Sequence, residues 1–145
     1  MERIVILGRG GAGKSTLARR LGEVTGLPVV ELDRIFWARG ASGLPPGEWA
    51  AAQRDLVGEP RWILDGDLGP YDRPGIRLAA ADTVVLLDFP FWRCAWRALG
   101  RAPERADFWE WVWAYRRRNA WPAREGWYVL RSPREVRGFV ARVAR

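Results

Sequence analysis

The sequence has 145 residues, 48% of them hydrophobic, and a formal net charge of +7. This length suits one domain with its own core, and no segment approaches the roughly 20 apolar residues that a membrane-spanning helix requires. The single cysteine, Cys94, excludes an internal disulfide, and the lack of histidine excludes histidine bases, histidine zinc ligands and Ser–His triads. We expect one cytoplasmic domain over residues 1–145, with no membrane partner.

Lysine is rare in this chain. Lys14 is the only one, and every other basic residue is an arginine. A positive net charge is compatible with a nucleic-acid partner, but arginine enrichment along the whole chain favours a general compositional bias, so nucleic acid is not the favoured partner. The one retained lysine indicates a position where a compact ammonium group is needed and a planar guanidinium does not fit.

Short apolar segments alternate with helical patterns along the chain, as in α/β folds with a parallel sheet. Residues 4–7 form an unbroken aliphatic run, typical of a strand buried on both faces. A helix is expected over 14–24, with Leu17, Leu21 and Val24 on its buried stripe. Further strands are expected at 29–32, 61–64, 83–87 and 127–130, and further helices at 48–56, 90–101 and 107–119.

The last helix has the clearest start signal. Ser132 is the expected N-cap, Pro133 takes the first helical position, and Glu135 completes a capping box. The apolar positions that follow recur at helical spacing and predict a buried stripe, formed by Val136, Phe139, Val140 and Val143.

A glycine-rich loop connects the first predicted strand to the first helix. Residues 8–15 read G-R-G-G-A-G-K-S and match the phosphate-binding pattern G-x-x-x-x-G-K-[ST] in the context that this pattern requires. Glycines allow close backbone approach, so the loop's N–H groups and the helix N-terminus point at an anion. A glycine turn that binds nothing is the alternative. The residues expected to bind ATP are Gly8, Gly10, Gly11, Ala12, Gly13, Lys14, Ser15 and Thr16.

Within this loop, Lys14 is expected to neutralise the β- and γ-phosphates, Ser15 to bind Mg²⁺ and Thr16 to contact the α-phosphate. GTPases read guanine through an Asn-Lys-x-Asp motif, which cannot exist here because the only lysine lies in the loop. Large ring ATPases need a longer chain. A small kinase therefore remains as the favoured class.

Outside the loop, the chain resembles the nucleoside monophosphate kinases, above all adenylate kinases. It resembles still more closely the small adenylate-kinase-like P-loop proteins called DNA topology modulation proteins. The segments that carry the resemblance span nearly the whole chain, and they are residues 31–33 with Trp37, 62–66, Arg77 with 81–82, 87–90 and 130–136. The resemblance implies a three-layer α/β P-loop fold with a five-stranded parallel sheet of order 2-3-1-4-5. It also implies an acceptor-binding segment at 34–60 and a short lid with its following helix at 101–118.

Two aspartates are expected at the carboxyl edge of this sheet. Asp65 ends the third predicted strand and resembles the aspartate that holds Mg²⁺ through water molecules; an exposed turn aspartate is the alternative. Asp33 ends the second strand, where P-loop kinases of small hydroxyl compounds contact the acceptor. It is expected to orient an acceptor hydroxyl or accept its proton, with a helix N-cap as the alternative. Asp88 also ends a strand, and a structural corner explains it equally well.

Arginines complete the expected site. Arg97 and Arg101 share one helix face and match lid arginines of adenylate kinases, where the first stacks on adenine and the second contacts phosphate oxygens. A solvated helix face is the alternative. Residues 116–118 are three arginines that either clamp the transferring phosphate or favour a helix C-terminus. Arg77 is expected to hold an acceptor phosphate, and Trp37 to flank a base or sugar.

The chain departs from adenylate kinases at several points. The lid is short, the segment 34–60 lacks an AMP-pocket sequence, and Asp67 stands where asparagine is expected in the closer family. The sequence therefore predicts an enzyme that moves the γ-phosphate of ATP to a nucleotide, nucleoside or similar small acceptor, as a monomer or homodimer. The alternatives are an ATP-binding regulatory protein that interacts with DNA, and a simple ATPase.

Overall fold

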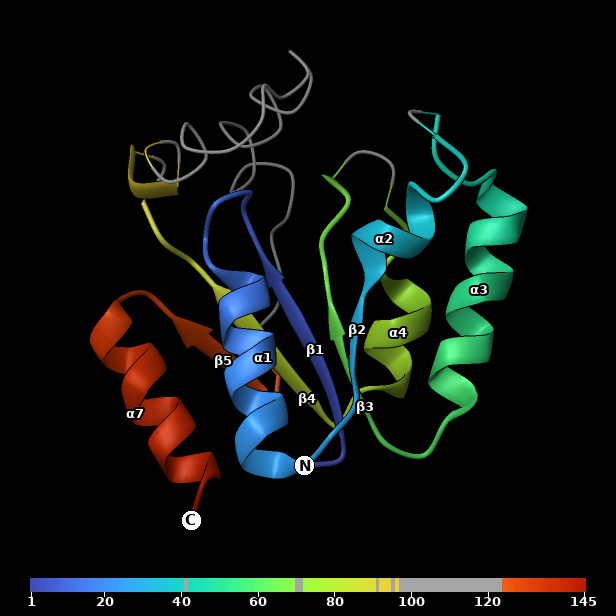
Figure 1. Ribbon diagram of the computed structural model, residues 1–145. Coiled ribbons are helices and arrows are strands. Elements are labelled where there is room, and N and C mark those ends of the chain that lie inside the picture. The colour runs from blue at the N-terminus through green and yellow to red at the C-terminus, as the bar shows by residue number, and fades with distance from the viewer. Residues whose placement is uncertain (41, 70–71, 91, 95, 97–123) are drawn as a thin grey trace.

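The computed structural model describes residues 1–40, 42–69, 72–90, 92–94, 96 and 124–145 (Figure 1). The strands are β1 (Arg3–Gly8), β2 (Val29–Glu31), β3 (Trp62–Asp65), β4 (Thr83–Leu87) and β5 (Trp127–Leu130). The labelled helices are α1 (Lys14–Thr25), α2 (Leu32–Phe36), α3 (Pro46–Gly58), α4 (Gly75–Ala80) and α7 (Pro133–Val143). Residues 92–94 and 96 are also helical, and the rest of the predicted helices 90–101 and 107–119 lies outside the described residues.

The five strands form one sheet in the order β2-β3-β1-β4-β5, and every pairing is parallel. Both the parallel sheet and its order are therefore confirmed. The central strand β1 pairs with β3 from Arg3 to Ile6 and with β4 from Ile4 to Gly8. Because all strands point the same way, their carboxyl ends meet at one edge, and this edge carries the glycine-rich loop.

Helices cover both faces of the sheet, as Figure 1 shows, with α1 and α7 on one side and α3 and α4 on the other. Alternate residues of β1 serve two separate cores. Ile4 and Ile6 belong to the core under α1 and α7, whereas Val5 and Leu7 belong to the core that includes Trp49 of α3. The β1 run is apolar throughout because both faces are buried.

The helix α7 begins as its cap signal predicts. The Ser132 hydroxyl accepts a hydrogen bond from the Glu135 N–H at 3.2 Å, and the Glu135 carboxylate accepts one from the Arg131 N–H at 2.9 Å. Phe139 is buried, and three valines pack partly buried beside it, namely Val136, Val140 and Val143.

Some details of the predicted elements were wrong, and the helix α4 was not expected from the sequence. Val24 is 40% exposed, and the buried stripe of α1 instead consists of Leu17, Ala18 and Leu21. A small alanine next to Leu17 lets the helix approach the sheet closely, whereas Val24 in its last turn is exposed. The second strand ends at Glu31, so Leu32 and Asp33 belong to α2 rather than to the strand. Within the described residues, no helix is both long and apolar enough to cross a membrane.

Candidate active site

The glycine-rich loop leaves the end of β1 and enters α1 in a conformation that needs its glycines. Gly11 and Gly13 have φ angles of 77° and 91°, in the left-handed region that side chains with a Cβ rarely adopt. A Cβ on Gly8 would lie 2.9 Å from the Leu87 carbonyl oxygen, so this glycine allows β1 to lie close to the end of β4. Gly13 is also the N-cap of α1, which places the helix N-terminus at the loop.

Lys14 is the first residue of α1 and turns its side chain back over the loop. Its Nζ donates hydrogen bonds to the carbonyl oxygens of Gly8 at 2.9 Å and Arg9 at 3.1 Å. Ser15 and Thr16 follow in the first turn of the helix, and both are exposed. Ala12 is buried and belongs to the core under α1 and α7. The structure therefore brings the predicted phosphate-binding residues together as one unit.

Asp65 ends β3 next to this loop. It pairs in register with Ile6 of β1 and with Glu31 of β2, and its side chain is buried. The following residue, Gly66, donates its N–H to the Ile6 carbonyl at 3.4 Å. The carboxylate thus lies at the carboxyl edge beside the P-loop strand, as the sequence predicts.

Asp33 lies in the first turn of α2, just past the same edge of the sheet. Its pKa is raised: partial loss of hydration is the largest cause, the Lys14 charge opposes it, and the charges of Asp65, Asp67 and Asp72 add to it. Asp33 therefore shares the carboxyl edge of the sheet with the loop that carries Lys14 and with Asp65 at the end of β3.

Two carboxylates of the segment between β3 and α4, Asp67 and Asp72, were not among the predicted site residues. Asp67 is mostly buried, and its Oδ1 accepts the Gly69 N–H at 3.1 Å. Asp67 lies two residues after Asp65, just beyond the strand, and this position could have marked it in the sequence as a candidate site residue. Asp72 carries no such signal, because its role depends on a partner from the next helix.

That partner is Arg77, which is fully buried. Its two terminal nitrogens bind both carboxylate oxygens of Asp72, and they also donate to Gln53 Oε1 at 2.9 Å and the Gly66 carbonyl at 3.2 Å. Gln53 of α3 in turn donates to the Arg73 carbonyl at 3.1 Å. In this structure Arg77 ties α3, α4 and the segment after β3 together, and contact with an acceptor phosphate stays a prediction.

The remaining predicted residues are placed as follows. Trp37 follows α2, where its ring meets Phe36 edge-on with centroids 4.7 Å apart, and it packs against the core that includes Trp49. Asp88 pairs with Arg131 at 3.5 Å and so links the ends of β4 and β5. The predicted lid and its arginines, Arg97, Arg101 and residues 116–118, lie outside the described residues.

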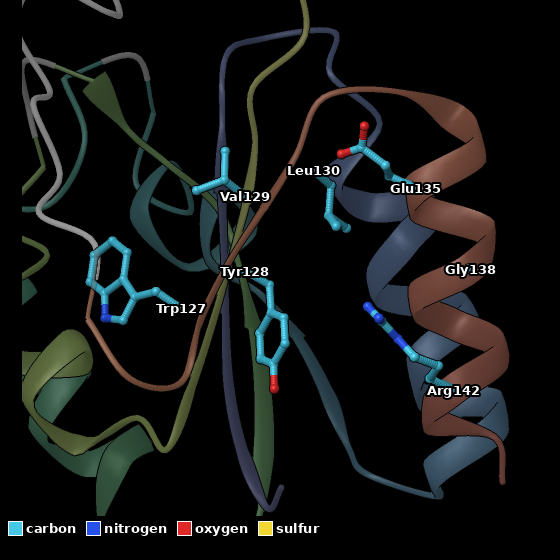
Figure 2. A pocket seen from close by; sticks show the side chains of 7 residues that line it. All are labelled: Trp127, Tyr128, Val129, Leu130, Glu135, Gly138 and Arg142. Carbon is cyan, nitrogen blue, oxygen red and sulfur yellow. The ribbon is translucent and has the colours of Figure 1, made fainter.

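A second feature is an open pocket of about 490 Å³ between β5 and α7. Figure 2 shows that Tyr128 and Arg142 extend into this gap, whereas Trp127 lies on the other side of the strand. Its lining residues include none of the predicted site residues. The pocket is therefore separate from the carboxyl edge where the loop, Asp33 and Asp65 meet.

The oxygen donors at the start of α1 and at the end of β3 can be compared with the ligands that a magnesium ion takes. Among the described residues, no group of three or more Cys, Asp or Glu side chains is arranged to hold a metal without other ligands. Mg²⁺ keeps several water molecules and takes one or two protein oxygens together with substrate phosphates. The Ser15 hydroxyl in the first turn of α1 and the Asp65 carboxylate at the end of β3 are oxygen donors of the kind that this requirement names.

Comparison with models of protein families found no match, and comparison with curated proteins found none. Solved structures of similar fold do exist. One is a sugar kinase from Janibacter sp. HTCC2649, with a TM-score of 0.68, 21% identity and coverage of 98% of this chain and 91% of that one. A gluconokinase from Sinorhizobium meliloti 1021 has a TM-score of 0.68 and 19% identity, with coverage of 99% and 93%.

A shikimate kinase from Bacteroides thetaiotaomicron has a TM-score of 0.62 and 18% identity, with coverage of 98% of this chain and 96% of that chain. At these identities the likeness concerns the fold. The fold of this chain, with its five-stranded parallel sheet and flanking helices, is similar to the folds of these proteins over nearly the whole chain.

Proposed function

We propose that this protein is an ATP-dependent kinase of a small hydroxyl compound. The observation that carries the proposal is the placement of Asp33 in the first turn of α2, just past the end of β2, at the sheet edge where β1 leads into the loop that carries Lys14. A phosphate-binding loop alone serves many nucleotide-binding proteins. Asp33 adds a second carboxylate, besides Asp65, at the same edge of the sheet. A carboxylate in this place suits an acceptor hydroxyl. The kinase names of proteins with similar folds support this reading.

In the proposed reaction, backbone N–H groups of the loop and the Lys14 ammonium hold the β- and γ-phosphates. Asp33 orients the acceptor hydroxyl and takes its proton as the oxygen attacks the γ-phosphorus. The bond between the γ-phosphorus and the bridging oxygen breaks, and ADP leaves. Ser15 and Asp65 would hold Mg²⁺, which neutralises charge on the β- and γ-phosphates when bound.

The finer assignments also belong to this proposal. We propose ATP as donor, Arg97 and Arg101 as lid residues that contact it, and a single domain with acceptor contacts from residues 34–60, including Trp37. Membership in the DNA topology modulation proteins and a cytoplasmic location stay predictions from the sequence. A simple ATPase is the outcome that the following experiment separates from a kinase, and an ATP-binding regulator of DNA would bind ATP in it without forming a phosphorylated acceptor.

The test is calorimetric titration of ATP with magnesium into the protein and its Lys14→Ala variant, together with product detection. The exposed Arg19→Ala on α1 is the matched control, because it removes one cation from the same helix outside the loop. We expect Lys14→Ala to abolish ATP binding and Arg19→Ala to leave it unchanged. ATP binding that survives in Lys14→Ala would refute the proposal. ADP formation that no acceptor accelerates would favour a simple ATPase.

A further inference from the structure

The pocket of about 490 Å³ between β5 and α7 shares no described lining residue with the glycine-rich loop. One wall is β5, the last strand in the sheet order, and the other wall is α7. Figure 2 shows that the side chains of Tyr128 and Arg142 enter the gap from these two elements. Pockets of this size hold small organic molecules. Two polar side chains from different elements therefore meet at a space that is large enough for a ligand.

Both side chains keep their polar groups available. Within the described part of the chain, neither the Tyr128 hydroxyl nor the Arg142 guanidinium has a hydrogen-bond or ion-pair partner. Tyr128 is 38% exposed, and its ring meets the ring of the buried Phe139 at a centroid distance of 5.0 Å. Phe139 thus supports the tyrosine ring from the core, and the exposed part of that ring can contact a ligand.

The charges of the lining favour an anion at the Arg142 end of the pocket. Among the described lining residues Glu135 is the only acid, and its carboxylate accepts the Arg131 N–H at 2.9 Å and the Ser132 hydroxyl at 3.2 Å. Glu135 precedes Arg142 by seven residues, which is about 10 Å along a helix axis and about the screening length at 0.1 M salt. The guanidinium therefore sets the charge at its own end of the pocket.

Gly138 keeps the pocket open on the side of α7. It lines the pocket one helical turn before Arg142, and nothing lies within 4 Å of the position that a Cβ would take. Glycine is unfavourable inside a helix, so helix formation alone does not explain its place here. Because Gly138 faces the free space, a longer side chain at this position would enter the pocket.

We propose that this pocket binds a planar aromatic anion, which is a ring system that bears a carboxylate or a phosphate. The Arg142 guanidinium pairs with two oxygens of the anionic group, and the Tyr128 hydroxyl provides a further hydrogen-bond donor. The ring system of the ligand lies against the exposed part of the Tyr128 ring. This site is separate from the proposed kinase site and does not depend on it.

The experiment titrates aromatic probes into the ¹⁵N-labelled full chain and follows the backbone amide signals by NMR. The probes are 2-naphthoate, 2-naphthyl phosphate, the neutral 2-naphthamide and the saturated decahydro-2-naphthoate. We expect both aromatic anions to shift the Tyr128 and Gly138 amide signals with a Kd of about 1 mM or below, as is usual for ligands of this size. The neutral amide should bind about tenfold more weakly or worse, because it forms no ion pair. The saturated anion should also bind more weakly.

Two variants test the residues that form the site. Arg142→Gln should weaken 2-naphthoate binding about tenfold or more. Its control is Arg137→Gln, which removes an exposed arginine of the same helix that does not line the pocket and should leave the affinity unchanged. Gly138→Leu should abolish binding by filling the pocket. Its Tm should not fall below that of the wild type, because leucine favours a helix and its Cβ meets free space.

The outcomes are distinguishable from those of the kinase test, which depends on Lys14. Equal affinity for 2-naphthoate and 2-naphthamide, or equal losses in Arg142→Gln and Arg137→Gln, would overturn the proposal. Shifts confined to Gly13 and the rest of the glycine-rich loop would place the anions there and would also overturn it. Binding of only one of the two aromatic anions at Tyr128 and Gly138 would support the site and identify its anionic group.

Discussion

The Nζ of Lys14 donates a hydrogen bond of 2.9 Å to the carbonyl oxygen of Gly8, the residue that ends β1. A second bond of 3.1 Å reaches the Arg9 carbonyl, so the ammonium group is held over its own loop. In the proposed function, phosphate oxygens would compete with these carbonyls for the same ammonium protons. The loop and its lysine therefore depend on each other's geometry, and a change in the loop backbone is expected to affect both.

Gly13→Ala tests this dependence. Because Gly13 has a φ of 91°, a Cβ there is expected to lower the free energy of unfolding by about 1–2 kcal/mol. It should also weaken ATP binding at least about tenfold, as the loop N–H groups shift out of line. Urea denaturation and calorimetry measure the two effects. Gly138→Ala in α7 is the control: nothing lies near its Cβ position, and helix propensity predicts a gain of about 0.5–1 kcal/mol. Unaltered ATP affinity in Gly13→Ala would contradict the assigned role.

Asp33→Asn should separate stability from activity. The pKa of Asp33 is raised by partial loss of hydration, against the Lys14 charge and with help from the neighbouring carboxylates. Its folded-state pKa exceeds the unfolded one, so its contribution to stability is complete at low pH and is lost as pH rises through the folded-state pKa. We expect Asp33→Asn to be more stable than the wild type at neutral pH, with the difference shrinking under acid. Product formation should fall about 100-fold or more.

Denaturant titrations of both proteins across a pH series check this expectation. A variant that is less stable than the wild type at neutral pH, with undiminished product formation, would show that Asp33 is a structural residue.

Asp82 lies far from the candidate site, and its replacement in Asp82→Asn should change the stability with a pH dependence opposite to that of Asp33→Asn. Partial burial raises the pKa of Asp82, but hydrogen bonds from the Thr83 hydroxyl and from the N–H groups of Glu2 and Arg3 outweigh it, and the pKa is lowered. A lowered pKa adds stability above the unfolded-state pKa, and this stability is lost as pH falls through the folded-state pKa.

We expect Asp82→Asn to lose roughly 1 kcal/mol at neutral pH, with the gap to the wild type closing under acid. ATP affinity should be unchanged, because Asp82 lies at the amino edge of the sheet before β4. Thermal unfolding across the same pH series gives the readout. A gap that widens on acidification would contradict the assignment.

Arg77→Met should lower the free energy of unfolding strongly, because it leaves the buried Asp72 carboxylate without its partner. Loss of one partner of a buried ion pair typically costs about 3–5 kcal/mol, and Asp72 is nearly as buried as Arg77. The control is Arg39→Met, which breaks an exposed pair with Glu48 and should cost less than about 1 kcal/mol. Adding Asp72→Asn to Arg77→Met should restore part of the loss, since the uncompensated charge is removed. A small loss of stability with a raised KM for the acceptor would instead favour a direct contact.

The parts of the fold that follow from local signals were predictable. The aliphatic run of β1, the loop pattern and the Ser132 cap each depend on neighbouring residues, and the structure confirms all three. Strand order is not local, and it came from the resemblance to small P-loop kinases. Val24 was misassigned because helical spacing gives a stripe but not the length over which another element covers it.

The acceptor side of the site was less predictable. A chain rich in arginine gives no sign of which guanidinium will be buried. The partners of Arg77 are Gln53 of α3, Gly66 just after β3 and Asp72, five residues before it in sequence. Only the folded chain brings Gln53 and Asp72 to it. The same holds for Asp33, whose electrostatic surroundings depend on carboxylates more than thirty residues away in sequence.

The central position of β1 has a consequence for how this protein is made. Its partners are β3 and β4, so the first strand to leave the ribosome stays unpaired until residues 65 and 87 have been synthesised. At about 5–20 residues per second, an apolar segment is exposed for several seconds. Nascent chains should therefore engage chaperones through residues 3–8.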